Sequence, residues 1–171
     1  MKTKYKSRPL SPKAIIQLYA EHYLNAPEDK IFPKVKREFR ELIHSRYTDI
    51  KNLGIKEVRV SGQPYNKAEE LFSDFEKNPR IQVSTDYNNP VVLDKEGNLQ
   101  FRFVHDYDHY LARSRFNWEG ELTACYYFFS FTNSEILRRI LRSEIIYQVS
   151  ASLYLGDFPE TQKIVLSDPR F

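Results

Sequence analysis

The chain has 171 residues, of which 41% are hydrophobic and 29% charged, enough for one domain with a core and too few for two. Its five glycines argue against Gly-rich phosphate-binding loops, and no apolar run reaches the roughly 18 residues of a membrane span. The single cysteine, Cys125, excludes an internal disulfide and a cysteine-based zinc site and fits a reducing cytoplasm.

The net charge of +3 hides an asymmetry. Residues 1–59 carry 14 Lys and Arg against 7 Asp and Glu, a net +7, whereas the remainder is net −4. A basic end of this kind attracts polyanions, so nucleic acid is one partner to consider. The segment contains no recognisable nucleic-acid motif, however, and solvated basic helices are the simpler interpretation.

The first part of the chain indicates an arm followed by two helices. Residues 1–10 are typical of a basic extended arm, and the Ser-Pro pair that follows predicts a helix over residues 12–25. Pro33 opens a second helix, in which apolar residues recur at helical spacing. Gly54 ends that helix as a C-terminal cap. Residues 11–54 therefore form a basic helical part.

The middle of the chain favours short strands around one helix. "IKEVRVSG", "RIQVSTD" and "PVVLD" are strand candidates, so a small sheet is expected. Between the first two, "QPYNKAEELFSDFEKNP" indicates a turn and an amphipathic helix capped by Asn66.

The second half is expected to be helical. "DKEGN" predicts a turn before a helix that carries "LQFRFVHDYDHYLARSRF". The first of these helices is expected to be capped by Asn98, and the second to run from about 119 to 131. A third, capped by Asn133 or Ser134, is expected to end at Gly156, and a short fourth helix covers "DFPETQKIVL". The sequence thus predicts a mainly α (α+β) protein: a single compact helical domain with a small peripheral β element, whose core spans residues 60–166.

Two histidines stand four residues apart in the helix expected after Asn98. His105 and His109 would project from one face of it, and two imidazoles in that relation can bind one transition metal. A third ligand must come from elsewhere. Glu121 is the first candidate, because it begins the next helix, which antiparallel packing returns beside the first. Glu144, four residues before Gln148, is the second.

The run "HDYDH" also has the spacing of the zinc metallopeptidase motif H-E-x-x-H. Asp106 then occupies the position of the general base, although Asp is one methylene shorter than Glu and reach matters for a base. Asp108 lies near the face of the two histidines. A zincin-like site would hold a divalent metal, with Zn²⁺ the leading candidate, and a hydrolase would use Asp106 or Glu144 as base.

Two alternatives stay open. The same residues could form a metal-free buried polar network that joins helices, since unpaired polar groups in a core cost roughly 1–3 kcal/mol or more. Alternatively, an HD-type phosphohydrolase would bind a metal through the adjacent His-Asp pair. That template needs an upstream histidine, His44 or His22, and a downstream aspartate, Asp157 or Asp168.

The order of several short runs resembles an uncharacterised family of tailed-phage and prophage proteins. The runs are "SGQPYNKAEELFSDF", "RIQVS", "FRFVHDYDHY", "GELTA", "EIIYQ" and "FPETQK", and together they cover about residues 60–166. The matching positions are Pro64, Tyr65, Arg102, His105, Asp106, His109, Glu121, Ala124, Glu144, Gln148, Gln162 and Lys163. The family has glycine near Asp108 and one further residue before its second histidine.

The resemblance implies a phage origin and singles out these residues without assigning them an activity. We therefore expect a polar site walled by three helices, in a protein of the host cytoplasm or the virion. It is either a metal-dependent hydrolase or a non-catalytic accessory protein that binds a phage or host partner; whether it is an enzyme stays open. The expected supporting residues are Asp108, Gln148, Gln162, Lys163 and Arg102.

Overall fold

The structure, a computed structural model, describes residues 10–169 and confirms a mainly α fold with a small β element. The N-terminal arm, predicted for residues 1–10, lies almost wholly outside the described residues. In chain order the elements are α1 (Pro12–Asn25), α2 (Pro33–Asn52), β1 (Lys56–Val60), α3 (Ala68–Lys77), β2 (Arg80–Ser84), α4 (Lys95–Ala112), α5 (Trp118–Phe129), α6 (Glu135–Arg142), the π-helical turn η1 (Ser143–Tyr147) and α7 (Gln148–Leu155).

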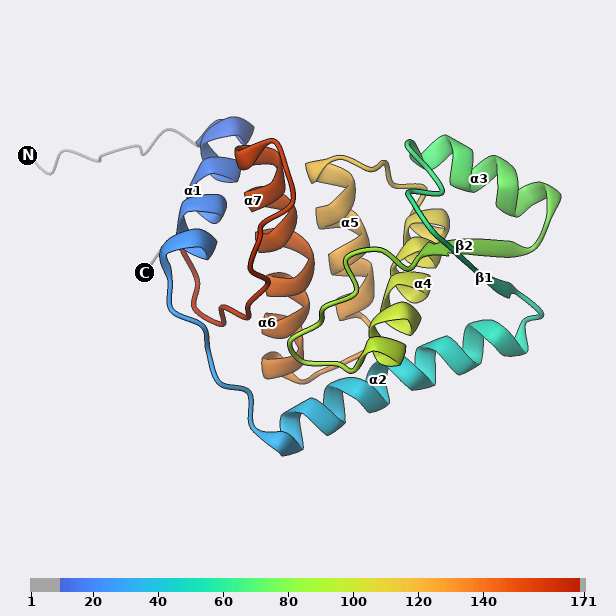
Figure 1. The fold of residues 1–171 in the computed structure, drawn as a ribbon, viewed down its shortest axis with the longest axis horizontal. Coiled ribbons are helices and arrows are strands. Elements are labelled where there is room, and N and C mark those ends of the chain that lie inside the picture. The colour runs from blue at the N-terminus through green and yellow to red at the C-terminus, as the bar shows by residue number, and fades with distance from the viewer. Residues whose placement is uncertain (1–9, 170–171) are drawn as a thin grey trace, which may run out of the picture.

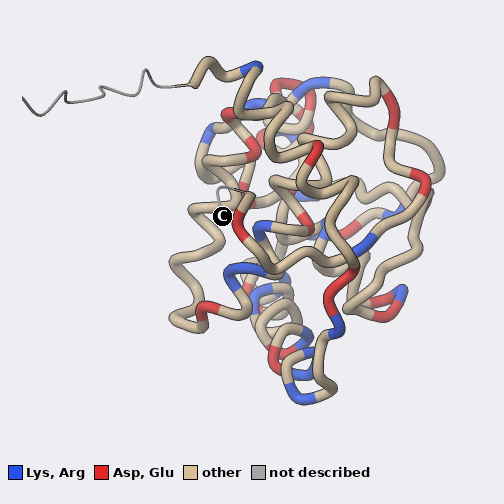
Figure 2. Tube along the Cα trace, turned by 90° about the vertical axis from the view of Figure 1, so that its left-hand side faces the viewer, with Lys and Arg blue, Asp and Glu red and all other residues tan. Residues whose placement is uncertain are grey.

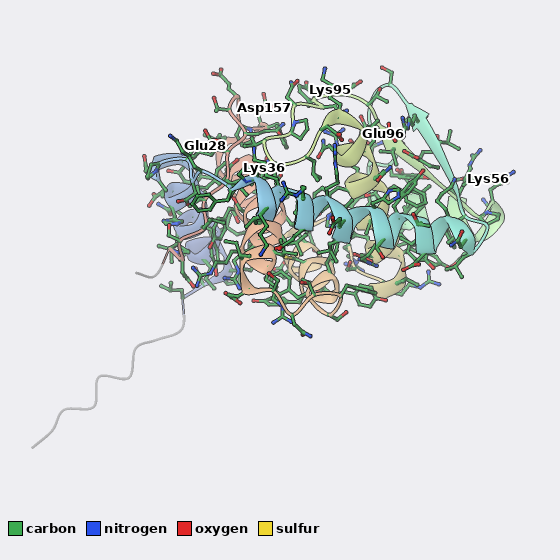
Figure 3. All side chains as sticks on the ribbon, turned by 90° about the horizontal axis from the view of Figure 1, so that it is seen from below. Glu28, Lys36, Lys56, Lys95, Glu96 and Asp157 are labelled. Carbon is green, nitrogen blue, oxygen red and sulfur yellow. The ribbon has the colours of Figure 1, made fainter. Side chains whose placement is uncertain are left out.

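Helix α5 lies near the middle of the molecule, between α4 and the segment formed by α6, η1 and α7 (Figure 1). Helix α1 packs along α7 on one side, and α3 with the two strands lies on the other. Helix α2 runs along the lower side in Figure 1 and faces the viewer in Figure 3, where Lys36 is labelled on it; it contacts α4. Because α4 packs against both α2 and α5, polar residues on two of its faces meet different partners.

Helix ends follow the local capping chemistry. Ser11 caps α1, where its hydroxyl accepts a hydrogen bond from the N–H of Ala14, with proline in the first turn as predicted. Asp94 caps α4 and Asn117 caps α5 in the same way. The prediction that Asn98 caps α4 is wrong: the helix begins one turn earlier, and the Asn98 side chain donates to Asn88 instead.

The sheet consists of β1 and β2, which pair in parallel from Lys56 opposite Arg80 to Val60 opposite Ser84. Helix α3 connects them, as a parallel pair requires a crossover. The prediction of a third strand at "PVVLD" is wrong: the structure describes residues 90–94, and they form a loop. Val92 and Leu93 of that run are buried, so its apolar residues fill the core from a loop that ends in the α4 cap.

The C-terminal segment is also irregular where a helix over residues 157–166 was predicted; that prediction is wrong. Ile164 and Val165 are buried, and the backbone is held by other elements. The Ile164 carbonyl accepts from Asp29 N, while Val165 N donates to Ser143 Oγ at 2.9 Å. These bonds to distant parts of the chain replace the local ones of a helix.

The long helix predicted after Ser134 does run to Gly156, but it is interrupted by the π-helical turn η1. Such turns widen a helix locally and occur often at functional sites. The interruption carries Glu144, one of the candidate site residues, and thereby sets the direction of its side chain.

Lys and Arg are interspersed with Asp and Glu along the chain (Figure 2). Within the basic helix α2, Lys36 donates to the carbonyl of Val91 and Arg46 pairs with Asp108. Part of the positive charge of the first third is thus used inside the fold. Among the described residues, no helix has the length and apolarity needed to cross a membrane.

Candidate metal centre

Helices α4 and α5 bring three potential metal ligands to one point. His105 Nε2 lies 2.9 Å from Glu121 Oε2, and His109 Nε2 lies 3.3 Å from the same oxygen. The two Nε2 atoms are 3.2 Å apart. The antiparallel return expected for the helix of Glu121 therefore places it beside both histidines. Within the described residues, these three make up the group of histidine and acidic side chains spaced to hold a metal ion.

The three separations match the geometry of a metal site. With metal–ligand bonds of roughly 2.0–2.1 Å, neighbouring ligand atoms of a tetrahedral centre lie roughly 3.3 Å apart. The observed values of 2.9, 3.2 and 3.3 Å need little adjustment to reach that spacing. His105, His109 and Glu121 fit a site with three protein ligands and one open position, as in catalytic zinc sites.

Residues at the end of α4 contact the His109 ring at Nδ1, the nitrogen that does not face Glu121. Arg113 adopts the left-handed conformation with φ 50°, which turns the chain so that Ser114 N donates to the His109 carbonyl. Ser114 Oγ then lies 2.8 Å from His109 Nδ1. The Ser114 carbonyl lies 3.3 Å from the same nitrogen, so a ring protonated at Nδ1 would donate to Ser114 and leave Nε2 available to a metal.

The start of α5 fixes Glu121. Asn117 caps the helix: its side chain accepts a hydrogen bond from the N–H of Gly120, the residue before the ligand, at 2.9 Å. Gly120 is needed for a close approach, because a Cβ atom at that position would overlap the backbone carbonyl of Arg115. The Gly-Glu pair in the sequence thus combines a backbone contact with a ligand.

His105 is held less completely than His109. Its Nδ1 is buried and has no hydrogen-bond partner among the described residues. Burial alone would lower the pKa of His105, but the charge of Glu121 and the hydrogen bond to it raise the pKa above its ordinary value. Burial would raise the pKa of Glu121, whereas the two histidines bring it down to about 2. Without a metal, the Glu121 carboxylate therefore favours the protonated form of His105.

The three residues lie at a cavity of about 420 Å³, to which His105 and Glu121 contribute wall atoms. Such a volume falls within the range of small-molecule sites. The cavity is framed by α4, α5, η1, α7 and the loops after β1, after β2 and after α7. Its lining includes aromatic rings and carboxamides beside the carboxylates: Tyr65, Tyr87, Phe101, Phe116, Phe158, Gln63, Asn98, Gln148 and Gln162.

Both candidate bases line this cavity. Neither Asp106 nor Glu144 has a hydrogen-bond or ion-pair partner in the part of the chain that the structure describes. Burial raises the pKa of Asp106 to about 6 against the opposing influence of His105 and His109. Burial alone raises the pKa of Glu144 to about 7. Glu144 is not one of the three grouped ligands, so Glu121 rather than Glu144 completes the histidine pair.

Three of the expected supporting residues also line the cavity, but their polar groups are engaged. Arg102 Nη1 donates to the carbonyls of Ser84 and Asp86 at 2.7 Å each, and Nη2 donates to that of Tyr87. Gln148 is hydrogen-bonded to Tyr23. Gln162 Nε2 lies 3.4 Å from the Tyr87 carbonyl. These residues hold the wall in shape.

The other two supporting residues lie away from the cavity lining. Asp108 turns toward α2, where Arg46 binds both of its oxygens at 2.6 and 2.7 Å. Lys163 Nζ donates to the carbonyls of Leu24 and Ala26 at the end of α1. Asp108 and Lys163 therefore join helices and the C-terminal segment, and do not contact the histidines.

The residues that an HD-type phosphohydrolase needs are not assembled in the described part of the chain. His22 Nε2 lies 3.0 Å from the Ser167 carbonyl, and His44 Nδ1 lies 3.3 Å from Gln100 Oε1. Neither histidine lines the cavity or belongs to the group that could hold a metal. Asp157 accepts a hydrogen bond from Phe158 N.

Several residues that shape the site escaped sequence reasoning. Ser114, Arg46 and Tyr87 have no helical periodicity or motif that marks them. Gly120 had a signal, since it directly precedes Glu121 in the run that resembles the phage family. The comparisons with known proteins add nothing to this picture: no protein-family model, curated protein or solved structure matches the chain.

Proposed function

We propose that this protein is a metal-dependent hydrolase that binds a divalent ion, preferably Zn²⁺, through His105, His109 and Glu121. The observation that carries the proposal is the meeting of two imidazole nitrogens and one carboxylate oxygen within 3.3 Å beside a cavity. The same ligand set also suits Fe²⁺, which metal analysis distinguishes.

A bound divalent ion supplies a Lewis acid and a water of lowered pKa. The chain supplies the remainder. Asp106 lies next to His105 on the cavity side of α4 and accepts the proton of the attacking water, because its carboxylate is not engaged elsewhere. The aromatic rings of Phe101 and Phe116 exclude bulk water from the reacting groups.

The resemblance to phage proteins supports a common site for these residues. Nine of the twelve matching positions line the cavity, although they are spread over about 100 residues of chain. They are Pro64, Tyr65, Arg102, His105, Asp106, Glu121, Glu144, Gln148 and Gln162. A phage-encoded enzyme would act in the host cytoplasm or the virion.

Metal analysis of purified protein tests the first half of the proposal. We expect about one equivalent of metal after loading with Zn²⁺ and dialysis, and well under one for His105→Ala, His109→Ala and Glu121→Gln. His44→Ala is the matched control, because this exposed histidine lies on α2, away from the site, and should leave the metal content unchanged. Well under one equivalent in the unaltered protein rejects the proposal.

Asp106→Asn tests the hydrolase half. The variant should keep its metal, because Asp106 is not a ligand, and lose at least 100-fold in rate toward ester or amide substrates hydrolysed by the loaded protein. Full activity in Asp106→Asn would remove Asp106 from the mechanism.

A non-catalytic phage interaction protein is the second candidate. The direct His105–Glu121 hydrogen bond of 2.9 Å favours it, because that bond joins α4 to α5 without an ion. In that case His105→Ala lowers the free energy of unfolding, and the unaltered protein has no metal-linked activity to lose. A specific host or virion partner would still be pulled down by the His105→Ala variant.

A further inference from the structure

The cavity wall contains more carboxylates than guanidinium or ammonium groups. Asp86, Asp106, Glu121 and Glu144 all line it, and Arg102 is the guanidinium that faces them within the described lining. Three backbone carbonyls accept hydrogen bonds from Arg102, and His105 is engaged by Glu121. In the metal-free protein, a ligand that entered as an anion would therefore meet carboxylates beside cationic side chains that already have partners.

The polar groups of the wall differ in whether they are already satisfied. Asp86 accepts from Gly62 N at 3.0 Å, and Glu121 is engaged by the two histidines. Asp106 and Glu144 are the two carboxylates of the described lining that lack a hydrogen-bond or ion-pair partner. Both residues are half-buried, so their unpaired carboxylates lie on the cavity wall as acceptors for donors that a ligand brings.

Asp106 and Glu144 sit in different electrostatic surroundings. Asp106 is influenced by His105, His109 and Arg102, whose positive charges partly compensate it. Burial is what raises the pKa of Glu144 to about 7, with no charged group acting on it. The π-helical turn η1 presents this carboxylate to the cavity in company with Ile145 and Val149. Glu144 is therefore the group that most lacks a positive partner.

We propose that the cavity selects a cationic organic ligand, whose positively charged group is bound by the Glu144 carboxylate. The proposal rests on the proposed function only in taking this cavity as the ligand site. The rings of Tyr65, Phe101 and Phe116 belong to the lining, and an aromatic ring attracts positive charge to its face. An amidinium or guanidinium can also donate two parallel hydrogen bonds to one carboxylate.

Two exposed aromatic rings lie at the opening of the cavity, where they can contact an organic cation. Tyr87 and Phe158 line the cavity and are 73% and 39% exposed, so they lie at its mouth, with ring centroids 6.2 Å apart. In a hydrolase with this cavity, the Glu144 carboxylate would select amide or ester substrates that carry a positively charged amine or guanidine group. Phosphate esters and carboxylates are disfavoured as substrates.

Three isosteric probes isolate the charge of the ligand: benzamidinium, benzamide and benzoate. We expect isothermal titration of the full chain, freed of metal with a chelator, at pH 8 to show benzamidinium binding at least tenfold more tightly than benzamide, and no measurable binding of benzoate. Titration is repeated on His109→Ala, so that the result does not depend on whether a metal is bound. If the unaltered chain binds the cation but takes up well under one equivalent of Zn²⁺, the proposed function alone is overturned.

Glu144→Gln removes the charge and keeps the size of the side chain. It should reduce the preference for benzamidinium over benzamide to less than about threefold. Glu160→Gln, an exposed residue near Phe158 that does not line the cavity, is the matched control and should keep the preference. The proposal is overturned if Glu144→Gln keeps the preference, if benzamide or benzoate binds as well as benzamidinium, or if none of the three binds. Should Glu144→Gln fail to fold, the probe series on the unaltered chain still decides.

Discussion

Arg46 of α2 and Asp108 of α4 form a bidentate ion pair in the core, with oxygen–nitrogen distances of 2.6 and 2.7 Å. The Asp108 side chain is fully buried and that of Arg46 is 6% exposed. The Arg46 guanidinium also lies 3.6 Å from the centroid of the Phe131 ring. By binding Asp108, the residue before His109, Arg46 ties α2 to the turn of α4 that carries the candidate ligand.

The first prediction concerns this pair. Arg46→Ala should lower the free energy of unfolding by about 3–5 kcal/mol, because it leaves Asp108 buried without its counter-charge. Urea unfolding measures the change. The exposed i,i+4 pair of Arg139 with Glu135 provides the control, since Arg139→Ala should cost less than about 1 kcal/mol. Equal losses in the two variants would show that the buried pair has no special role.

The second prediction is that Gly120→Ala disturbs the ligand Glu121. A methyl group at residue 120 overlaps the Arg115 carbonyl, so the first turn of α5 must move. We expect a loss of about 1–3 kcal/mol of stability and at least a tenfold weaker Zn²⁺ affinity. Gly97 occupies the equivalent third position of α4, and its N–H is likewise bound by the capping side chain. Gly97→Ala should leave the affinity for Zn²⁺ within threefold; a similar effect of both variants would contradict this account.

The third prediction is that stabilisation by Zn²⁺ grows with pH. Glu121 raises the pKa of His105 in the metal-free protein, so the ion pair is fully present below the unfolded pKa of histidine, roughly 6.5, and is lost as pH rises through the folded value. A metal needs the deprotonated ring and takes over above that value. The Tm increase on adding Zn²⁺ should therefore be small at pH 5.5 and large at pH 8. An increase independent of pH would show that the ion binds elsewhere.

The fourth prediction is that Glu144 costs the protein stability. Its folded pKa of about 7 exceeds the ordinary value of 4.5, so the folded state holds a proton that the unfolded state has lost, and stability falls as pH rises between these values. Glu144→Gln removes this penalty. Urea unfolding should show the variant more stable by roughly 1–3 kcal/mol at pH 8 and nearly equal at pH 4. A variant less stable at both pH values would mean that the Glu144 carboxylate has a stabilising partner.

Local chemistry allowed much of the fold to be predicted. The helix starting at Pro12 and the strands β1 and β2 have periodic apolar residues and clear ends. The helix bearing the histidines was predicted from its periodicity, but its start was placed one turn too late. The predictions for "PVVLD" and "DFPETQKIVL" were wrong for one reason. Their apolar residues are buried against distant parts of the chain, and local patterns do not contain such long-range contacts. The backbone of Ile164, for example, is bonded to that of Asp29.

The candidate site shows the same division. Helical spacing and the short connection to α5 were enough to bring His105, His109 and Glu121 together. The partner of Asp108 lies 62 residues away in α2, and the partners of Lys163 lie on α1. Neither spacing nor periodicity reveals that these two charged side chains are used to join elements instead of lining the cavity.

Anomalous diffraction from crystals grown with Zn²⁺ tests the central claim most directly. We predict one strong peak at the zinc edge, about 2.0–2.1 Å from His105 Nε2, His109 Nε2 and a Glu121 oxygen, and its loss in His109→Ala. A map of the zinc-soaked protein with no peak there, or with zinc bound only by surface residues, would contradict it.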